Sequence, residues 1–194
     1  FATILIGSRI GRFSDKKNTT SDTNDKVEHI SEESPVEFKS TNVPFVVLGT
    51  LLLWFSWYGF NCGSTITIAG TGATIVAKIG MNTSLAAASG GLTCLFFQYY
   101  YVKLTKKETD PDYEIYSVGQ ICNGLLSGLV GVTASCDVVA PWAAFIIGII
   151  SALIYIGYSE LINYLKIDDP LSAVSIHGGA GSWGVVAAGW FHPD

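Results

Sequence analysis

Long apolar stretches alternate with polar connections along the whole chain. Five of these stretches contain no Asp, Glu, Lys or Arg, and each approaches the roughly 20 residues that a helix needs to cross the hydrocarbon core of a bilayer. Five uncharged runs in succession are typical of a membrane protein rather than of a soluble core. The pattern predicts an all-α fold, a polytopic membrane helix bundle, with helices at residues 43–63, 85–102, 118–134, 138–158 and 171–191 and the end of one more at 1–7.

Basic residues gather in every second connection between these stretches. One set of connections holds ten of the eleven Lys and Arg residues: Arg9, Arg12, Lys16, Lys17, Lys26, Lys39, Lys103, Lys106, Lys107 and Lys166. The other set holds only Lys78. Cytoplasmic loops of membrane proteins are enriched in Lys and Arg, so the first set is predicted to be cytoplasmic. The stretches 43–63 and 171–191 then both run outward.

Composition supports this class and excludes others. Apolar residues make up 49% of the chain and charged residues 14%, with 21 glycines that suit close helix contacts. The net charge is −5, many of the charged residues lie at residues 9–39, and no basic stripe suggests a nucleic-acid partner. The four cysteines lack CxxC spacing and are predicted to be small buried apolar residues: Cys62, Cys94, Cys122 and Cys136.

The polar segment at residues 8–42 is mixed in charge and poor in aromatic residues. It is predicted to be a flexible cytoplasmic linker, and its many Ser and Thr residues leave a regulatory role as an alternative. The chain begins without Met inside an apolar run, so residues 1–194 are expected to be one partial domain of a longer polypeptide.

The stretch LLWFSWYGFNCGS places three candidate binding residues on one helix face. Trp57, Phe60 and Ser64 are spaced i, i+3 and i+7, at the outer end of their helix. Two aromatic rings and a hydroxyl can bind a small cation by cation–π attraction and a hydrogen bond. The alternative is an aromatic belt at the membrane interface, which places Trp and Tyr at the same depth.

His177 is the candidate inside the last apolar stretch, SAVSIHGGAGSWG. An ionisable side chain in hydrocarbon usually faces the bundle interior or a water-filled path. A neutral imidazole both donates and accepts hydrogen bonds, which suits a polar solute or a proton relay. An interhelical hydrogen bond explains it equally well. Small residues follow on its face at Ala180, Gly181 and Gly184, which predicts a narrow lumen or a tight helix contact.

The residues before this stretch predict a helix start, with Asp169 as the N-cap and Pro170 at the first helical position. No Ser–His–Asp set, zinc spacing or phosphate-binding loop is present in the sequence. We therefore expect no enzymatic activity, no metal and no cofactor.

Five motifs together resemble the ammonium transporter (Amt/Mep) family. They are IGSRIGRF, LGTLLLWFSWYGFNCGS, NTSLAAASGGL, ICNGLLSGLVGVTASCDVVAPWAA and DDPLSAVSIHGGAGSWGVVAAG, in the order of the family. They cover nearly all of the chain outside residues 14–42. The resemblance implies an eleven-helix protein with two inverted halves that assembles as a homotrimer, one pore per subunit. This chain would be the end of helix five through helix ten.

The resemblance also implies roles for the candidate residues. Phe60 would be one of two phenylalanines that gate the outer vestibule, Ser64 the hydroxyl of the outer ammonium site, and Trp57 a neighbour of that gate. His177 would be the second of two pore histidines and Asp169 the acid at the inner helix start. The first histidine would lie upstream of Phe1. Many relatives carry an acid where this chain has Ser172.

The implied function is transmembrane transport of ammonium or ammonia, with methylammonium as a further candidate substrate. NH4+ would be recruited outside and deprotonated, and neutral nitrogen would pass along the histidines, because an intact ion in an apolar pore is costly. The expected location is the lipid bilayer of the plasma membrane. Two alternatives are an ammonium sensor and a neutral gas channel of the Rhesus type.

Overall fold

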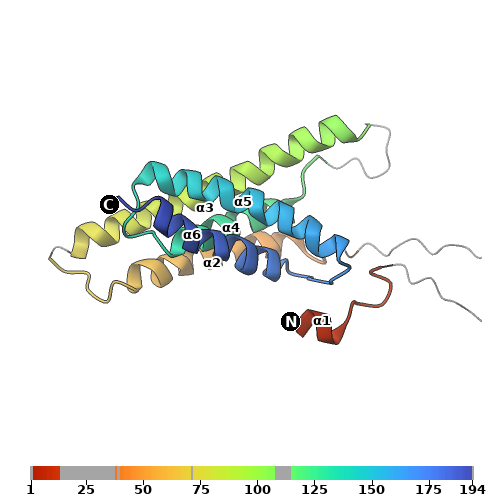
Figure 1. The fold of residues 1–194 in the computed structure, drawn as a ribbon, viewed down its shortest axis with the longest axis horizontal. Helices are drawn as coiled ribbons and strands as arrows, with labels where there is room; N and C mark the ends of the chain where they lie inside the picture. Colours follow the sequence, from red (N-terminus) through yellow and green to blue (C-terminus); the bar gives the residue numbers. More distant parts are fainter. Residues whose placement is uncertain (1, 14–37, 39, 71, 108–114, 194) are drawn as a thin grey trace, which may run out of the picture.

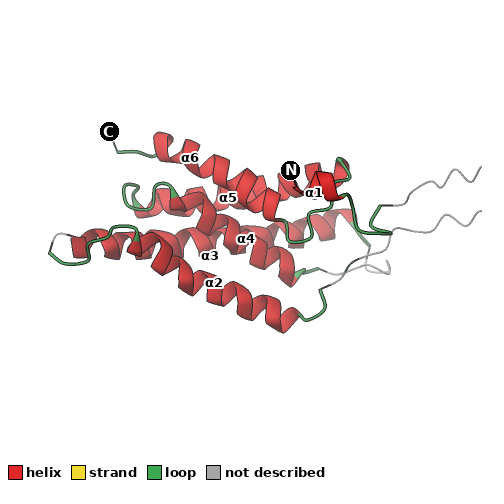
Figure 2. Ribbon diagram, turned by 90° about the horizontal axis from the view of Figure 1, so that it is seen from below, coloured by secondary structure: helices red, strands yellow, loops and turns green. Residues whose placement is uncertain are grey.

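The regular elements of the computed structural model are all helices in the part of the chain that it describes, and their axes run along one common direction (Figures 1 and 2). The described residues are 2–13, 38, 40–70, 72–107 and 115–193. In chain order the helices are α1 (Ala2–Ile6), α2 (Val43–Gly63), α3 (Gly72–Thr105), α4 (Val118–Thr133), α5 (Pro141–Tyr164), the π-helix η1 (Val174–Ala180) and α6 (Gly181–Trp190).

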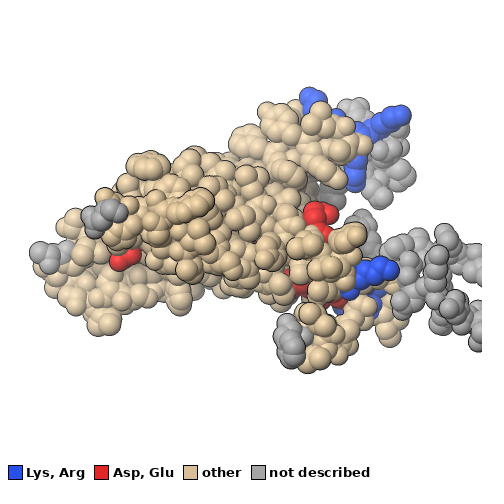
Figure 3. All heavy atoms as spheres, in the orientation of Figure 1, with Lys and Arg blue, Asp and Glu red and all other residues tan. Residues whose placement is uncertain are grey.

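The bundle has two ends, which correspond to the two predicted sides of a membrane. The outer end carries the last turns of α2 and α6 and the short turn between α4 and α5, while α1 and the ends of α3 and α5 lie at the inner end (Figure 1). On the face drawn in Figure 3, the Lys and Arg side chains lie at the inner end. This arrangement agrees with the cytoplasmic assignment of the inner end.

Helix α4 is central, because it contacts α2, α3, α5, η1 and α6. Glycine makes these close approaches possible. A Cβ atom on Gly128 would collide with the carbonyl oxygen of Ala86 in α3, and a Cβ atom on Gly184 would lie 2.6 Å from the carbonyl oxygen of Gly131. The glycine-rich sequence of α4 therefore allows its backbone to approach both α3 and α6.

Helix α3 is longer than the sequence pattern predicts. It begins at Gly72 rather than at residue 85, and its 34 residues span about 50 Å at the usual helical rise. Lys78 consequently lies inside the helix and not in an extracytoplasmic connection. Its Nζ donates a hydrogen bond of 2.8 Å to the carbonyl oxygen of Val138 in the α4–α5 turn, which supplies a partner for the charged group.

Polar side chains of α3 also hold the outer part of the bundle together. The Asn82 amide, which is fully buried, donates to the carbonyl oxygens of Cys136 and Val139, each at 2.9 Å. Thr83 accepts a hydrogen bond of 3.1 Å from the amide of Asn61 in α2. These bonds satisfy polar groups inside the bundle and explain why α3 is less apolar than a lipid-facing helix.

Among the described helices, α2 and α5 are long and apolar enough to cross a bilayer by length and composition alone. Helix α4 has only 16 residues, and the last predicted stretch is divided into η1 and α6. The stretch predicted at 138–158 forms a helix over Pro141–Tyr164, because Pro141 suits a first helical position and the apolar pattern continues to Tyr164. Most of the polar segment 8–42 lies outside the described residues.

Candidate functional site

Three of the predicted site residues form one group at the outer end of α2, the outer cluster of Trp57, Phe60 and Ser64. The rings of Trp57 and Phe60 are 5.7 Å apart between centroids and tilted by 58°. Phe60 is 60% exposed, so its ring is accessible. Ser64 follows the last residue of α2 and donates a 2.6 Å hydrogen bond to the carbonyl oxygen of Phe60. Because its only proton is used there, its oxygen is left as an acceptor.

The indole of Trp57 is fixed from α4 by a residue that the sequence analysis did not single out. Its Nε1 donates to Thr133 Oγ1 at 3.0 Å, and Thr133 Oγ1 donates in turn to the carbonyl oxygen of Leu129 at 2.7 Å. The hydroxyl proton is therefore committed to Leu129, which leaves the oxygen free to accept the indole N–H. No local sequence signal marks Thr133, because the partner is 76 residues away in the chain.

Replacing Thr133 with Val should release the indole without changing the side-chain volume much. We expect the half-saturation constant for ammonium uptake by the full-length protein to rise about twofold to tenfold, the equivalent of one lost hydrogen bond. Uptake kinetics at matched membrane abundance measure this change. Thr133→Ser, which keeps the hydroxyl, is the control. Equal effects of Val and Ser would contradict the role of the hydrogen bond.

The fourth predicted residue, His177, lies in the middle of η1. It is exposed in the described structure, whereas the preceding residues Ser175 and Ile176 are buried. Within the described residues, His177 has no hydrogen-bond partner, so no interhelical bond of the kind considered above is present there. A π-helical turn widens the helix by one residue and is frequent at functional sites. Here it places the imidazole on the open face.

The start of η1 differs from the prediction. Pro170 is not the first helical residue, because the helix begins at Val174 and Ser172 adopts a left-handed conformation with φ of 53°. Asp169 nevertheless supplies cap hydrogen bonds. Its carboxylate accepts from the backbone N–H groups of Ala173 at 3.0 Å and Val174 at 2.8 Å. The extra bend at Ser172 is what moves the helix start downstream.

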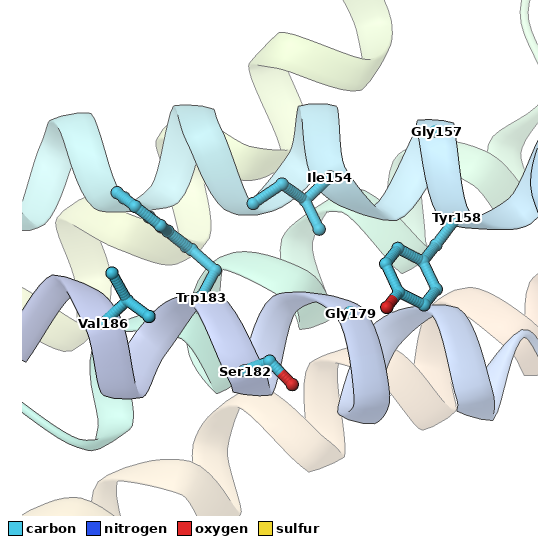
Figure 4. A pocket seen from close by; sticks show the side chains of 7 residues that line it. All are labelled: Ile154, Gly157, Tyr158, Gly179, Ser182, Trp183 and Val186. Atoms are coloured by element: carbon cyan, nitrogen blue, oxygen red, sulfur yellow. The ribbon is translucent and has the colours of Figure 1, made fainter.

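An open apolar groove lies beside η1, between α5 and α6 (Figure 4). Its volume is about 410 Å³, and Tyr158 points from α5 toward Gly179 at its inner side, close enough that a Cβ atom there would lie 3.0 Å from the tyrosine ring. Ser182 and Tyr158 contribute hydroxyls to its wall, and the Ser182 hydroxyl donates to the carbonyl oxygen of Gly178. The groove is therefore largely hydrocarbon.

The structure does not bring His177 into contact with the outer cluster. Helix α4 separates them, because α2 contacts α3 and α4 but neither η1 nor α6. The two candidate sites are thus arranged in sequence from the outer end inward. No group of three or more potential metal ligands occurs in the described part of the chain.

The described helices, two of them long and apolar enough to cross a bilayer, define a class, that of polytopic membrane proteins built from helices. The chain belongs to the Ammonium Transporter Family, whose model matches residues 2–194. The resemblance seen in the five motifs is confirmed, and so is the fold class, a polytopic membrane helix bundle. Members of this family are transporters and not enzymes.

Several relatives illustrate the similarity. The chain is 36% identical over 200 residues to ammonium transporter 1 member 1 of Solanum lycopersicum, covering 98% of this chain and 36% of that protein. It is 38% identical to ammonium transporter 1 member 2 of Oryza sativa subsp. japonica, covering 97% of this chain and 34% of that protein. The chain therefore spans about a third of the length of these relatives.

Solved structures give the same result. A protein described as Sensor Amt Protein matches with a TM-score of 0.74 and 32% identity, over 98% of this chain and 40% of that one. Mep2 of Candida albicans matches with a TM-score of 0.69 and 34% identity, over 80% of this chain and 31% of that one. Both likenesses concern the helical bundle, and they place this chain among multi-pass integral membrane proteins.

Proposed function

We propose that this chain forms one part of a pore that transports ammonium or ammonia across a membrane. The observation that carries the proposal is the outer cluster, in which an accessible aromatic pair and an oriented hydroxyl acceptor lie together on an otherwise apolar helix. The relatives named above, which are ammonium transporters by description, support the choice of substrate.

The outer cluster would recruit NH4+ rather than NH3. Ring faces attract a cation through their quadrupole, worth about 0.5–2 kcal/mol depending on desolvation. Ser64 Oγ, whose proton is held by the Phe60 carbonyl, presents lone pairs to an N–H donor. A neutral ammonia molecule would gain only the second of these interactions.

Beyond Phe60 the ion would lose its proton, and ammonia would continue along the path past His177. An isolated cation in an apolar lumen costs several kcal/mol or more, whereas a neutral solute that hydrogen-bonds to an imidazole costs far less. The exposed position of His177 on η1 supports contact with the solute. We expect the full-length protein to be a homotrimer in the plasma membrane, with one pore per subunit and with methylammonium as a possible second substrate.

Uptake measurements test this function directly. Full-length protein should restore ammonium uptake in cells that lack their own transporters, at low external ammonium. Ser64→Ala should raise the half-saturation constant by about threefold to thirtyfold, since it removes an acceptor for a charged donor. Thr74→Ala is the matched control, because Thr74 is also an exposed hydroxyl at the outer end. Failure of the wild type to restore uptake would refute the function.

A sensor is the second candidate, favoured by the likeness to a protein described as a sensor. The polar segment 8–42 supplies a cytoplasmic region through which a signal could pass. Replacing residues 14–37 with a Gly/Ser linker of equal length separates the two functions. A sensor should lose ammonium-dependent signalling while uptake continues, and unchanged signalling would count against it.

A further inference from the structure

A half-buried ion pair connects two distant segments at the inner end of the bundle. Asp168 lies in the connection between α5 and η1, and its side chain is only 3% exposed. Arg9, which follows α1, makes a bidentate contact with the Asp168 carboxylate: Nε lies 2.7 Å from Oδ2 and Nη2 lies 2.7 Å from Oδ1. The backbone N–H of Arg9 donates to Oδ2 as well, at 2.9 Å. Such bidentate contacts fix the relative orientation of the two side chains in addition to pairing their charges.

Further groups enclose this ion pair. Arg12 Nε lies 3.8 Å from Asp168 Oδ1, and Arg12 Nη2 donates to the side-chain oxygen of Asn163 at the end of α5 at 3.3 Å. The ring of Phe38 covers the guanidinium of Arg9, with 4.2 Å between Cζ and the ring centroid. Phe38 and Arg12 lie on opposite sides of the polar segment 14–37 in the sequence. Both sides of that segment therefore meet at one ion pair.

The charge on this carboxylate persists at ordinary pH. The hydrogen bonds from Arg9 lower the pKa of Asp168 from 3.8 to about 2 and raise that of Arg9. A carboxyl with a lowered pKa stabilises the folded state above its unfolded pKa, and this contribution is lost as the pH falls toward 2. The ion pair is therefore a permanent contact at physiological pH and not a pH switch.

Asp168 is directly followed by the residue that caps η1. Asp169 holds the N–H groups of Ala173 and Val174, and η1 carries His177 one turn later. The two neighbouring acids thus have different partners, one in the segment after α1 and one at the start of η1. Movement of Asp168 must be transmitted to Asp169 through a single peptide unit and then to the helix start.

We propose that the Arg9–Asp168 ion pair is a positioning device that fixes the start of η1 against the end of α1 and so sets the placement of His177. This role rests on the proposed function, in which His177 meets the transported solute. Arg9 and Asp168 contact no solute themselves. Phe38 supports the pair by covering one face of the guanidinium.

The chemical accessibility of position 177 tests this role without relying on transport. In the full-length protein with its native cysteines replaced, His177→Cys is titrated with a charged thiol reagent, with and without Asp168→Asn. Ser64→Cys is treated in parallel, because α2 makes no contact with η1 or α1. We expect Asp168→Asn to change the modification rate at position 177 at least about threefold, because residues in one contact network are energetically coupled. The rate at position 64 should stay constant, because distant sites that share no partners are independent. Arg9→Lys keeps the charge but loses the bidentate contact, and should change the modification rate at position 177 less than Asp168→Asn does.

The outcomes separate the possibilities. Equal rates at position 177 with and without Asp168→Asn would overturn the proposal, and so would parallel changes at both positions, which indicate general loosening. If Asp168→Asn does not reach the membrane, Arg9→Lys and Phe38→Leu decide the question by the same measurement. Wild-type uptake is recorded alongside: its absence would refute the transport function, whereas constant accessibility would refute only the positioning role.

Discussion

Full-length protein carrying His177→Ala is expected to take up ammonium about fivefold to a hundredfold more slowly than the wild type, with trimer assembly intact. An apolar lumen offers a polar solute few partners, and an unmade hydrogen bond costs about 1–3 kcal/mol there. The imidazole is exposed on η1 and has no partner among the described residues, so its removal should break no internal contact. Uptake rates and native gel migration measure the two halves of this prediction.

Ser182→Ala provides the control for this variant. Ser182 is an exposed polar residue in the adjacent helix α6, and its hydroxyl bonds only to the carbonyl oxygen of Gly178 in the described structure. It should leave the uptake rate within about twofold of the wild type, as surface substitutions usually do. A His177→Ala protein that fails to assemble would instead indicate a structural histidine.

Gly128→Ala should destabilise the bundle itself. A Cβ atom at this position would collide with the carbonyl oxygen of Ala86, a backbone atom that cannot move away without shifting α3. Overpacking of this kind costs about 1–3 kcal/mol or more. We expect reduced membrane abundance and a lower temperature of thermal aggregation for the detergent-solubilised protein.

Gly49→Ala is the matched control, because a Cβ atom on this helical glycine meets nothing within 4 Å in the described structure. Alanine also has the higher helix propensity, so this change should be neutral or slightly stabilising. Equal losses of abundance for both variants would mean that the close approach of α4 to α3 is not what limits stability.

The sequence predicted helices well where placing one residue type in hydrocarbon costs much free energy. Uncharged runs of about 20 residues predicted α2 directly, since charge is expensive in hydrocarbon. The pattern was less accurate for α3, whose outer half contains Lys78 and buried polar residues. Those groups are tolerated because carbonyl oxygens of the α4–α5 turn accept their hydrogen bonds, and such partners cannot be read from the α3 sequence.

The same contrast applies to the candidate sites. The i, i+3, i+7 spacing placed Trp57, Phe60 and Ser64 together because the first two belong to α2 and Ser64 is its helical C-cap. The acceptor that fixes Trp57 comes from α4, and the partner of Asp168 comes from the segment after α1, 159 residues away. Helix periodicity contains no information about contacts between helices at such separations.

By itself, then, the sequence determined the helical class and the family, and it predicted the outward direction of α2 and of the last helical stretch, because burial, charge and local spacing act along the chain. Only the tertiary structure decided that α4 separates the outer cluster from His177, that η1 is a π-helix, and that Arg9 reaches Asp168. These features depend on backbone packing at glycine contacts and on polar groups that find partners across the bundle. Their physical origin is that most buried hydrogen-bonding groups of a folded protein find a partner within the fold.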